Sequence, residues 1–136
     1  PAGSLGKRLL IRVGDLMHSG DALPQVSQDA DLKAAILEMS AKGLGMTAVV
    51  DTEQKALGVI TDGDLRRCVE AGVDLRSRTA QDVMHASPMT IKPDLLAVAA
   101  ARMMEEHGIT AVLVADDNQR LQGVVHIRDL MRAKVI

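Results

Sequence analysis

The sequence predicts an α+β fold made of two β-α-β-β-α modules, related by a pseudo-twofold axis and packed sheet to sheet. The first observation is an internal repeat: a shift of 65 positions places residues 29–67 on residues 94–132, with 13 of 39 positions identical. The second is size, because 136 residues can form a core of their own, whereas one half alone is too small to bury its apolar face. Two facing sheets satisfy both observations.

The composition is typical of a soluble globular protein, with 47% hydrophobic and 25% charged residues. Phe, Tyr and Trp are absent, so Leu, Val, Ile, Ala and eight Met must fill the core. The lack of aromatic residues and a net charge of -2 argue against nucleic-acid binding. No run approaches the roughly 18 apolar residues that cross a bilayer, so membrane insertion is not expected. A single cysteine, Cys68, indicates a reducing, cytoplasmic compartment.

The first repeat has the pattern of a helix, a β-hairpin and a second helix. Apolar residues at helical spacing predict a helix over 31–42, with Asp29 or Asp31 as its cap and Gly43 at its left-handed end. Short apolar runs predict strands over 46–50 and 57–60, joined by the turn 51–55. A second helix is predicted over 62–71.

The second repeat predicts the same order of elements. A strand is expected near 90–91, a helix over 94–107, strands over 111–115 and 121–125, and a helix over 127–133. We therefore place the first module at 13–72, a linker at 73–79 and the second module at 80–136. Residues 1–12 are expected to be a linker, and the opening Pro1-Ala2-Gly3-Ser4 is typical of the edge of a piece of a longer protein.

The two repeats together resemble a tandem pair of CBS domains, an arrangement known as a Bateman module. The residues that carry the resemblance are 43–47, Asp51 and 57–65 in the first copy, and 108–112, Asp116, 121–125 and Asp129-Leu130 in the second. A narrower likeness, carried by residues 5–10, 15–18, 42–51, 61–67 and 123–127, is to the C-terminal half of the bacterial D-arabinose 5-phosphate isomerase family.

This likeness implies a regulatory role. The family interconverts ribulose 5-phosphate and arabinose 5-phosphate for the biosynthesis of Kdo, a sugar acid of lipopolysaccharide and some capsules. Catalysis would belong to an N-terminal sugar-isomerase (SIS) domain outside this chain. The chain itself shows no catalytic set of residues, so we expect it to be non-catalytic.

The resemblance also implies a ligand site, because nucleotides bind between the two modules of CBS pairs. Residues 58–64 match the contact motif of a glycine, two apolar residues, Ser or Thr, two free positions and Asp. Thr61 at a strand-to-helix junction suits a phosphate, and Asp64 can accept hydrogen bonds from a ribose diol. Thr47 and Thr110 are further candidate contacts. The alternative is structural, since Thr61 and Asp64 also form the pattern of a capping box.

The second copy departs from the motif, because His126 stands where Thr61 stands, while Asp129 keeps the acidic position. Histidine is a poor helix cap, which weakens the structural explanation there. An imidazole can donate to a phosphate or a carboxylate, so the second site is expected to take a more acidic ligand, such as a sugar acid nucleotide. The alternative is that His126 is an exposed loop residue.

Histidines also raise the question of a metal site. His18, His85 and His107 lack the spacing and companion cysteines of a metal site, and the first two occupy equivalent places in the repeat, so we interpret them as duplicated structural residues.

The leading hypothesis is a regulatory module that needs no cofactor and binds an adenine nucleotide or CMP-Kdo. A module that only holds subunits together, or a CBS sensor of another enzyme or a transporter, remains the alternative. In either case we expect a homo-oligomer.

Overall fold

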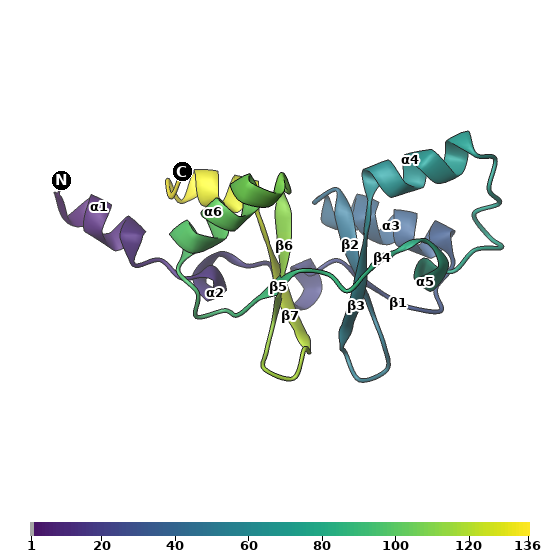
Figure 1. Cartoon of the computed structure of the whole chain (residues 1–136), viewed down its shortest axis with the longest axis horizontal. Coiled ribbons are helices and arrows are strands. Elements are labelled where there is room, and N and C mark those ends of the chain that lie inside the picture. Colours follow the sequence, from purple (N-terminus) through teal and green to yellow (C-terminus); the bar gives the residue numbers. More distant parts are fainter. Residues whose placement is uncertain (1) are drawn as a thin grey trace. The chain divides into compact units, whose positions relative to one another are not determined.

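Two small sheets, each built around a β-hairpin, organise residues 2–136, which the computed structural model describes (Figure 1). The chain divides into two units. One consists of residues 21–88, and the other combines the N-terminal residues up to Gly20 with Met89–Ile136. The predicted α+β class is confirmed. No helix among the described residues is both long and apolar enough to cross a bilayer.

The unit of residues 21–88 contains a four-stranded sheet in the order β1-β2-β3-β4. β1 (Gln25–Ser27) runs parallel to β2 (Met46–Val50), which pairs antiparallel with β3 (Ala56–Thr61), and β3 pairs antiparallel with β4 (His85–Ala86). After the 3-10 turn η1 (Gly20–Ala22), the helices are α3 (Leu32–Lys42), α4 (Asp62–Glu70) and α5 (Ala80–Val83). The buried cluster of this unit is aliphatic and consists of Leu32, Ala35, Met39, Val49, Ile60 and Ala80.

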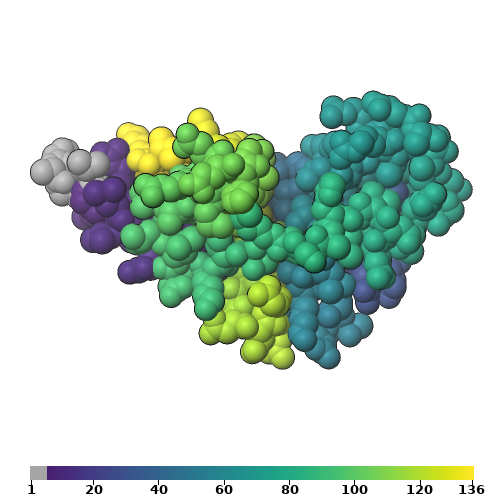
Figure 2. Space-filling model, viewed as in Figure 1, coloured from purple at the N-terminus to yellow at the C-terminus, as the bar shows by residue number. Residues whose placement is uncertain are grey.

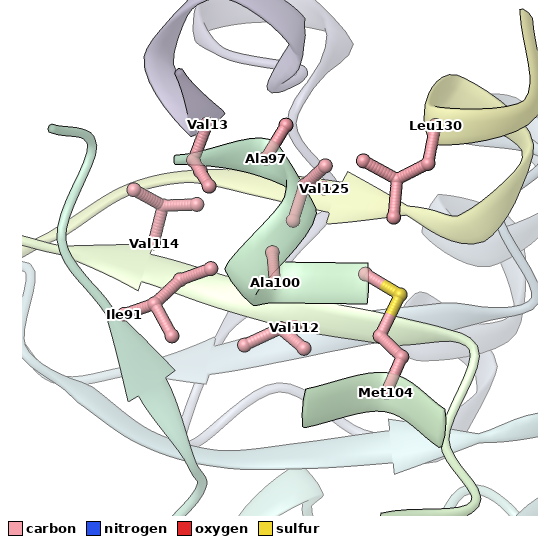
Figure 3. Packing of buried hydrophobic residues seen from close by; sticks show 9 residues of the cluster. All are labelled: Val13, Ile91, Ala97, Ala100, Met104, Val112, Val114, Val125 and Leu130. Carbon is pink, nitrogen blue, oxygen red and sulfur yellow. The ribbon is translucent and has the colours of Figure 1, made fainter. Parts of the chain in front are cut away.

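The other unit repeats this arrangement with a three-stranded sheet. β5 (Thr90–Ile91) runs parallel to β6 (Ala111–Ala115), which pairs antiparallel with β7 (Leu121–His126). Its helices are α6 (Ala97–His107) and α7 (Ile127–Arg132), joined by α1 (Ala2–Leu9) and α2 (Val13–Leu16) from the other end of the chain. Figure 3 shows its packed core: Val13, Ile91, Ala97, Ala100, Met104, Val112, Val114, Val125 and Leu130.

Most predicted elements lie within one or two residues of their expected positions, but α6 begins three residues late, at Ala97 instead of residue 94. The reason is tertiary. The residues before α6 are extended because the N-terminal segment binds them: Val13 N donates to the Leu95 carbonyl and Ala97 N donates to the Ile11 carbonyl, both at 2.8 Å. These bonds hold residue 95 outside the helix that its sequence would otherwise extend.

The N-terminal segment, which we expected to be a linker, contains the helix α1 over residues 2–9. Its Leu, Lys and Arg residues favour a helix, and Lys7 and Arg8 in the last turn complement the helix dipole. The module boundaries at 13–72 and 80–136 stay a prediction. The compact units divide the chain differently, since residues up to Gly20 lie with the second repeat.

Each repeat binds the segment that precedes the other repeat in the sequence. His18 N donates to the Val124 carbonyl at 2.8 Å, and Val124 N returns a bond to the His18 carbonyl at 3.0 Å. In the unit of residues 21–88, His85 of β4 is paired with Val59 of β3 in the same way. The purple N-terminal residues accordingly lie against green and yellow parts of their own unit (Figure 2).

A glycine lies opposite each exchanged segment because the backbones approach closely there. A Cβ atom on Gly58 would lie 2.5 Å from Met84 Sδ and 2.7 Å from the His85 carbonyl oxygen. A Cβ atom on Gly123 would lie 2.7 Å from Met17 Sδ and 2.8 Å from the His18 carbonyl oxygen. A methionine side chain can move aside, but a paired backbone carbonyl cannot. The close backbone contact therefore explains why both copies of the repeat have a glycine at this position.

Replacement of either glycine should destabilise the fold. We expect Gly58→Ala and Gly123→Ala each to lower the free energy of unfolding by about 1–3 kcal/mol, because the added methyl group overpacks a fixed backbone contact. Urea unfolding followed by circular dichroism measures the change. Gly6→Ala is the matched control, since its Cβ position has no atom within 4 Å among the described residues outside its own helical backbone and chain neighbours, and it should leave stability unchanged or slightly higher. Unaltered stability of both test variants would contradict the close approach.

Candidate functional site

The first candidate site is the junction where β3 ends and α4 begins. Thr61 is the N-cap of α4, with extended backbone angles of φ -113° and ψ 167°. Its backbone N–H donates to Asp64 Oδ2 at 2.8 Å, and its hydroxyl accepts from the Asp64 N–H at 3.4 Å. The capping box that the sequence offered as the structural alternative is therefore present. The same two residues still stand together at the end of a strand, as a ligand site would need.

The Asp64 carboxylate accepts more hydrogen bonds than any other group of this site, and only 5% of the residue is exposed. Besides the backbone bond from Thr61, Oδ2 accepts from the Thr61 hydroxyl at 3.0 Å. Oδ1 accepts from Arg67 Nη2 at 2.6 Å and from His85 Nε2 at 2.7 Å. Burial raises the pKa of this carboxyl, but the hydrogen bonds from Thr61, His85 and Arg67 outweigh burial and hold the pKa below its ordinary value. Asp64 is therefore an anion at neutral pH.

The second candidate site is the junction between β7 and α7. His126 is the N-cap of α7, and its Nδ1 accepts from the Arg128 N–H at 3.0 Å. The His126 N–H donates to Asp129 Oδ2 at 2.8 Å, which completes a capping box. The expectation that histidine caps poorly here was wrong. A neutral imidazole carries a lone pair on one ring nitrogen, and this lone pair serves the helix N-terminus as a hydroxyl does in the first copy.

The protonation of His126 follows from its surroundings. Burial lowers its pKa, the Arg128 cation lowers it further, and together they outweigh the Asp129 carboxylate, which raises it. The ring is neutral at pH 7, with Nδ1 as the acceptor and the proton on Nε2. The site therefore offers one imidazole N–H donor.

Two histidines of the exchanged segments pair with the two carboxylates. His18 Nε2 lies 2.9 Å and 3.0 Å from the two oxygens of Asp129, as His85 lies against Asp64. The sequence reasoning placed both histidines at equivalent positions but did not connect them to the carboxylates. The signal that could have done so is the shared Asp-x-Met-His pattern upstream of each repeat. No group of three or more potential metal-ligating side chains occurs in the part of the chain that the structure describes.

Thr47 and Thr110, the other two predicted site residues, differ in their exposure to a ligand. Thr47 is fully buried in β2, and its hydroxyl donates to the Ala48 carbonyl at 3.1 Å, so its side chain presents no surface to a ligand. Thr110 is exposed just before β6, and its carbonyl accepts from the Ile127 N–H at 2.8 Å. The structure thus brings Thr110 to the second junction.

Curated relatives match the chain over its whole length. It is 46% identical over 136 residues to the arabinose 5-phosphate isomerase KdsD of Yersinia pestis and to that of Escherichia coli K12, and 44% identical to that of Pseudomonas aeruginosa. These matches cover all of this chain but only 41–42% of each relative, so the chain spans about two fifths of their length.

Solved structures share the fold at low sequence identity. CBSX2 in complex with AMP superposes with a TM-score of 0.79 at 22% identity, covering 92% of this chain and 96% of that one. A CBS domain protein from Pyrobaculum aerophilum complexed with AMP gives 0.79 at 24% identity, covering 88% and 90%. The family model described as the CBS domain matches twice, at residues 13–71 and 80–136. The chain therefore belongs to the CBS domain family, of which it contains a tandem pair.

Proposed function

We propose that this chain is the regulatory CBS pair of an arabinose 5-phosphate isomerase and that it binds a nucleotide or sugar nucleotide, such as an adenine nucleotide or CMP-Kdo. The whole protein would interconvert ribulose 5-phosphate and arabinose 5-phosphate in Kdo biosynthesis in the cytoplasm, as a homo-oligomer. Its SIS domain would hold the catalytic residues.

The observation that carries the biological setting is the match to the KdsD isomerases, at 46% identity without a gap in coverage of this chain. The motif of residues 58–64 in the first repeat supports a ligand-binding role. Two CBS proteins with this fold are bound to AMP, which supports a nucleotide as the class of ligand for this chain.

The chemistry of the first junction suits a nucleotide. α4 has nine residues, and its N-terminal N–H groups and dipole favour an anion such as a phosphate. The Thr61 hydroxyl can donate to that anion in place of its bond to Asp64. Asp64 is ionised, so it can accept hydrogen bonds from a ribose diol. A phosphate and a ribose can thus be held by two residues three positions apart.

The second junction carries more positive charge. The guanidinium groups that act on His126 are those of Arg128 and Arg132, against the single carboxylate of Asp129. The neutral imidazole can add its Nε2–H as a donor. We infer that this junction prefers the more acidic of two ligands, for example a sugar acid nucleotide over a nucleoside monophosphate.

A purely structural role is the competing function, and the two capping boxes favour it directly. In that case Thr61, Asp64, His126 and Asp129 would only stabilise helix termini. The pair would then hold subunits together without a ligand.

Calorimetric titration of the 136-residue chain with AMP, ATP, CMP and CMP-Kdo distinguishes the two functions. We expect heat from at least one ligand, with binding weakened about tenfold or more by Thr61→Ala, because the hydroxyl donor is lost. His126→Ala should weaken the more acidic ligand more strongly. Glu70→Gln, which changes an exposed carboxylate at the far end of α4, is the control and should bind normally. No heat from any ligand at about 100 micromolar protein would favour the structural role.

The ionisation of Asp64 can be tested through stability. The native pKa lies below the ordinary value of 3.8, so the stability from this carboxylate is fully present above about pH 4 and is lost as pH falls through the lowered pKa. Asp64→Asn should therefore lower the free energy of unfolding by about 1–3 kcal/mol at neutral pH, and this difference should narrow in acid. Urea unfolding across a pH series measures it, with Glu70→Gln, at the exposed far end of α4, as the control. A difference independent of pH would mean that Asp64 is not an anion in the native state.

A further inference from the structure

The Asp64 carboxylate has no lone pair to spare for a ligand. Two carboxylate oxygens offer about four acceptor sites. Four donors fill them: Thr61 N at 2.8 Å and Thr61 Oγ1 at 3.0 Å on Oδ2, with Arg67 Nη2 at 2.6 Å and His85 Nε2 at 2.7 Å on Oδ1. A ligand hydroxyl can bind Asp64 only if one of these donors leaves.

The donors on Oδ1 decide whether both hydroxyls of a diol can bind. On Oδ2 the Thr61 backbone N–H is fixed by the cap, while the Thr61 hydroxyl can turn to a bound phosphate and free one acceptor site. A second ligand hydroxyl, on Oδ1, needs Arg67 or His85 to leave. The side chains of Arg67 and His85 are 63% and 69% exposed, so water can replace the bond that either one gives up. Loss of an exposed hydrogen bond costs far less than loss of a buried one.

His85 differs from Arg67 in what its release would do. Arg67 lies one turn along the same helix as Asp64, so their bond joins two positions within α4. His85 belongs to β4, three residues before the unit ends at Pro88 and the chain passes into the other unit. His18 lies in the corresponding place in the other repeat, two residues before Gly20, after which the chain passes into the unit of residues 21–88.

We propose that His85 is a positioning residue that competes with the ligand for Asp64, so that ligand binding frees the segment leading from one unit to the other. This inference rests on the proposed function, because it concerns the same carboxylate. His18 Nε2 likewise lies within 3.0 Å of both oxygens of Asp129. A ligand on Asp64 would thereby change how firmly residues 85–88, which lead into the other unit, are held, and this is a route from binding to regulation.

Two measurements on the full 136-residue chain test the proposal. Amide hydrogen exchange without ligand reports how firmly residues 85–87 are held, and titration with AMP and CMP-Kdo reports affinity. In His85→Ala we expect faster exchange at these residues and binding tighter by roughly three- to tenfold, because the competing donor is gone. His85→Gln keeps a donor and should lie close to wild type. His107→Ala, an exposed histidine at the end of α6, is the matched control.

The outcomes separate this inference from the proposed function. Weaker binding in His85→Ala would make His85 a ligand contact and overturn the competition. Unchanged hydrogen exchange at residues 85–87 in that variant, or unchanged ligand affinity, would also overturn the competition. No heat from either ligand with any variant would overturn the proposed function and the competition with it, while the exchange data would still decide whether His85 anchors β4.

Discussion

The exchange of two short segments between the repeats is the constraint on which the other features depend. Residues 11–18 bind the second repeat through backbone hydrogen bonds to residues 93–97 and to Val124. Residues 79–86 bind the first repeat, where Ala80 N donates to the Ala30 carbonyl at 2.7 Å and β4 extends the sheet. These bonds shorten α6, require a glycine in β3 and in β7, and bring a histidine to each carboxylate. The unit of residues 21–88 is one continuous stretch, whereas the other unit is assembled from both ends of the chain.

The exchange also explains why a chain without aromatic residues can fill its cores. Val13 and Ala80, one from each exchanged segment, are fully buried within clusters that the other repeat provides. The side chains around them are Leu, Ile, Val, Ala and Met, which interdigitate without leaving a polar atom to satisfy. Met17 and Met84 are the flexible members, and they cover the two glycines. Local contacts within one repeat would not close either core.

Periodicity and the repeat predicted the elements well, because helices such as α3 are determined locally. Asp31 accepts from the Ala34 N–H at 2.8 Å and Gly43 has a φ of 71°, as its pattern indicates. The start of α6 was wrong because it depends on a backbone more than 80 positions away in sequence. Of the candidate site, the pairing of Thr61 with Asp64 was predicted. His85 was not linked to Asp64, since only the fold brings together residues 21 positions apart.

The capping role and the ligand role of the two junctions do not exclude each other. A cap orders the carboxylate and the hydroxyl before any ligand arrives, so a ligand would bind without the entropic cost of ordering them. The same bonds compete with the ligand, and its net affinity is reduced by every donor that it displaces. A ligand shifts a conformational equilibrium only by the difference in its affinity for the two states. A carboxylate already shared with an exposed histidine of another segment supplies such a difference, whereas a site whose donors all lie on one element would bind without consequence for the rest of the chain.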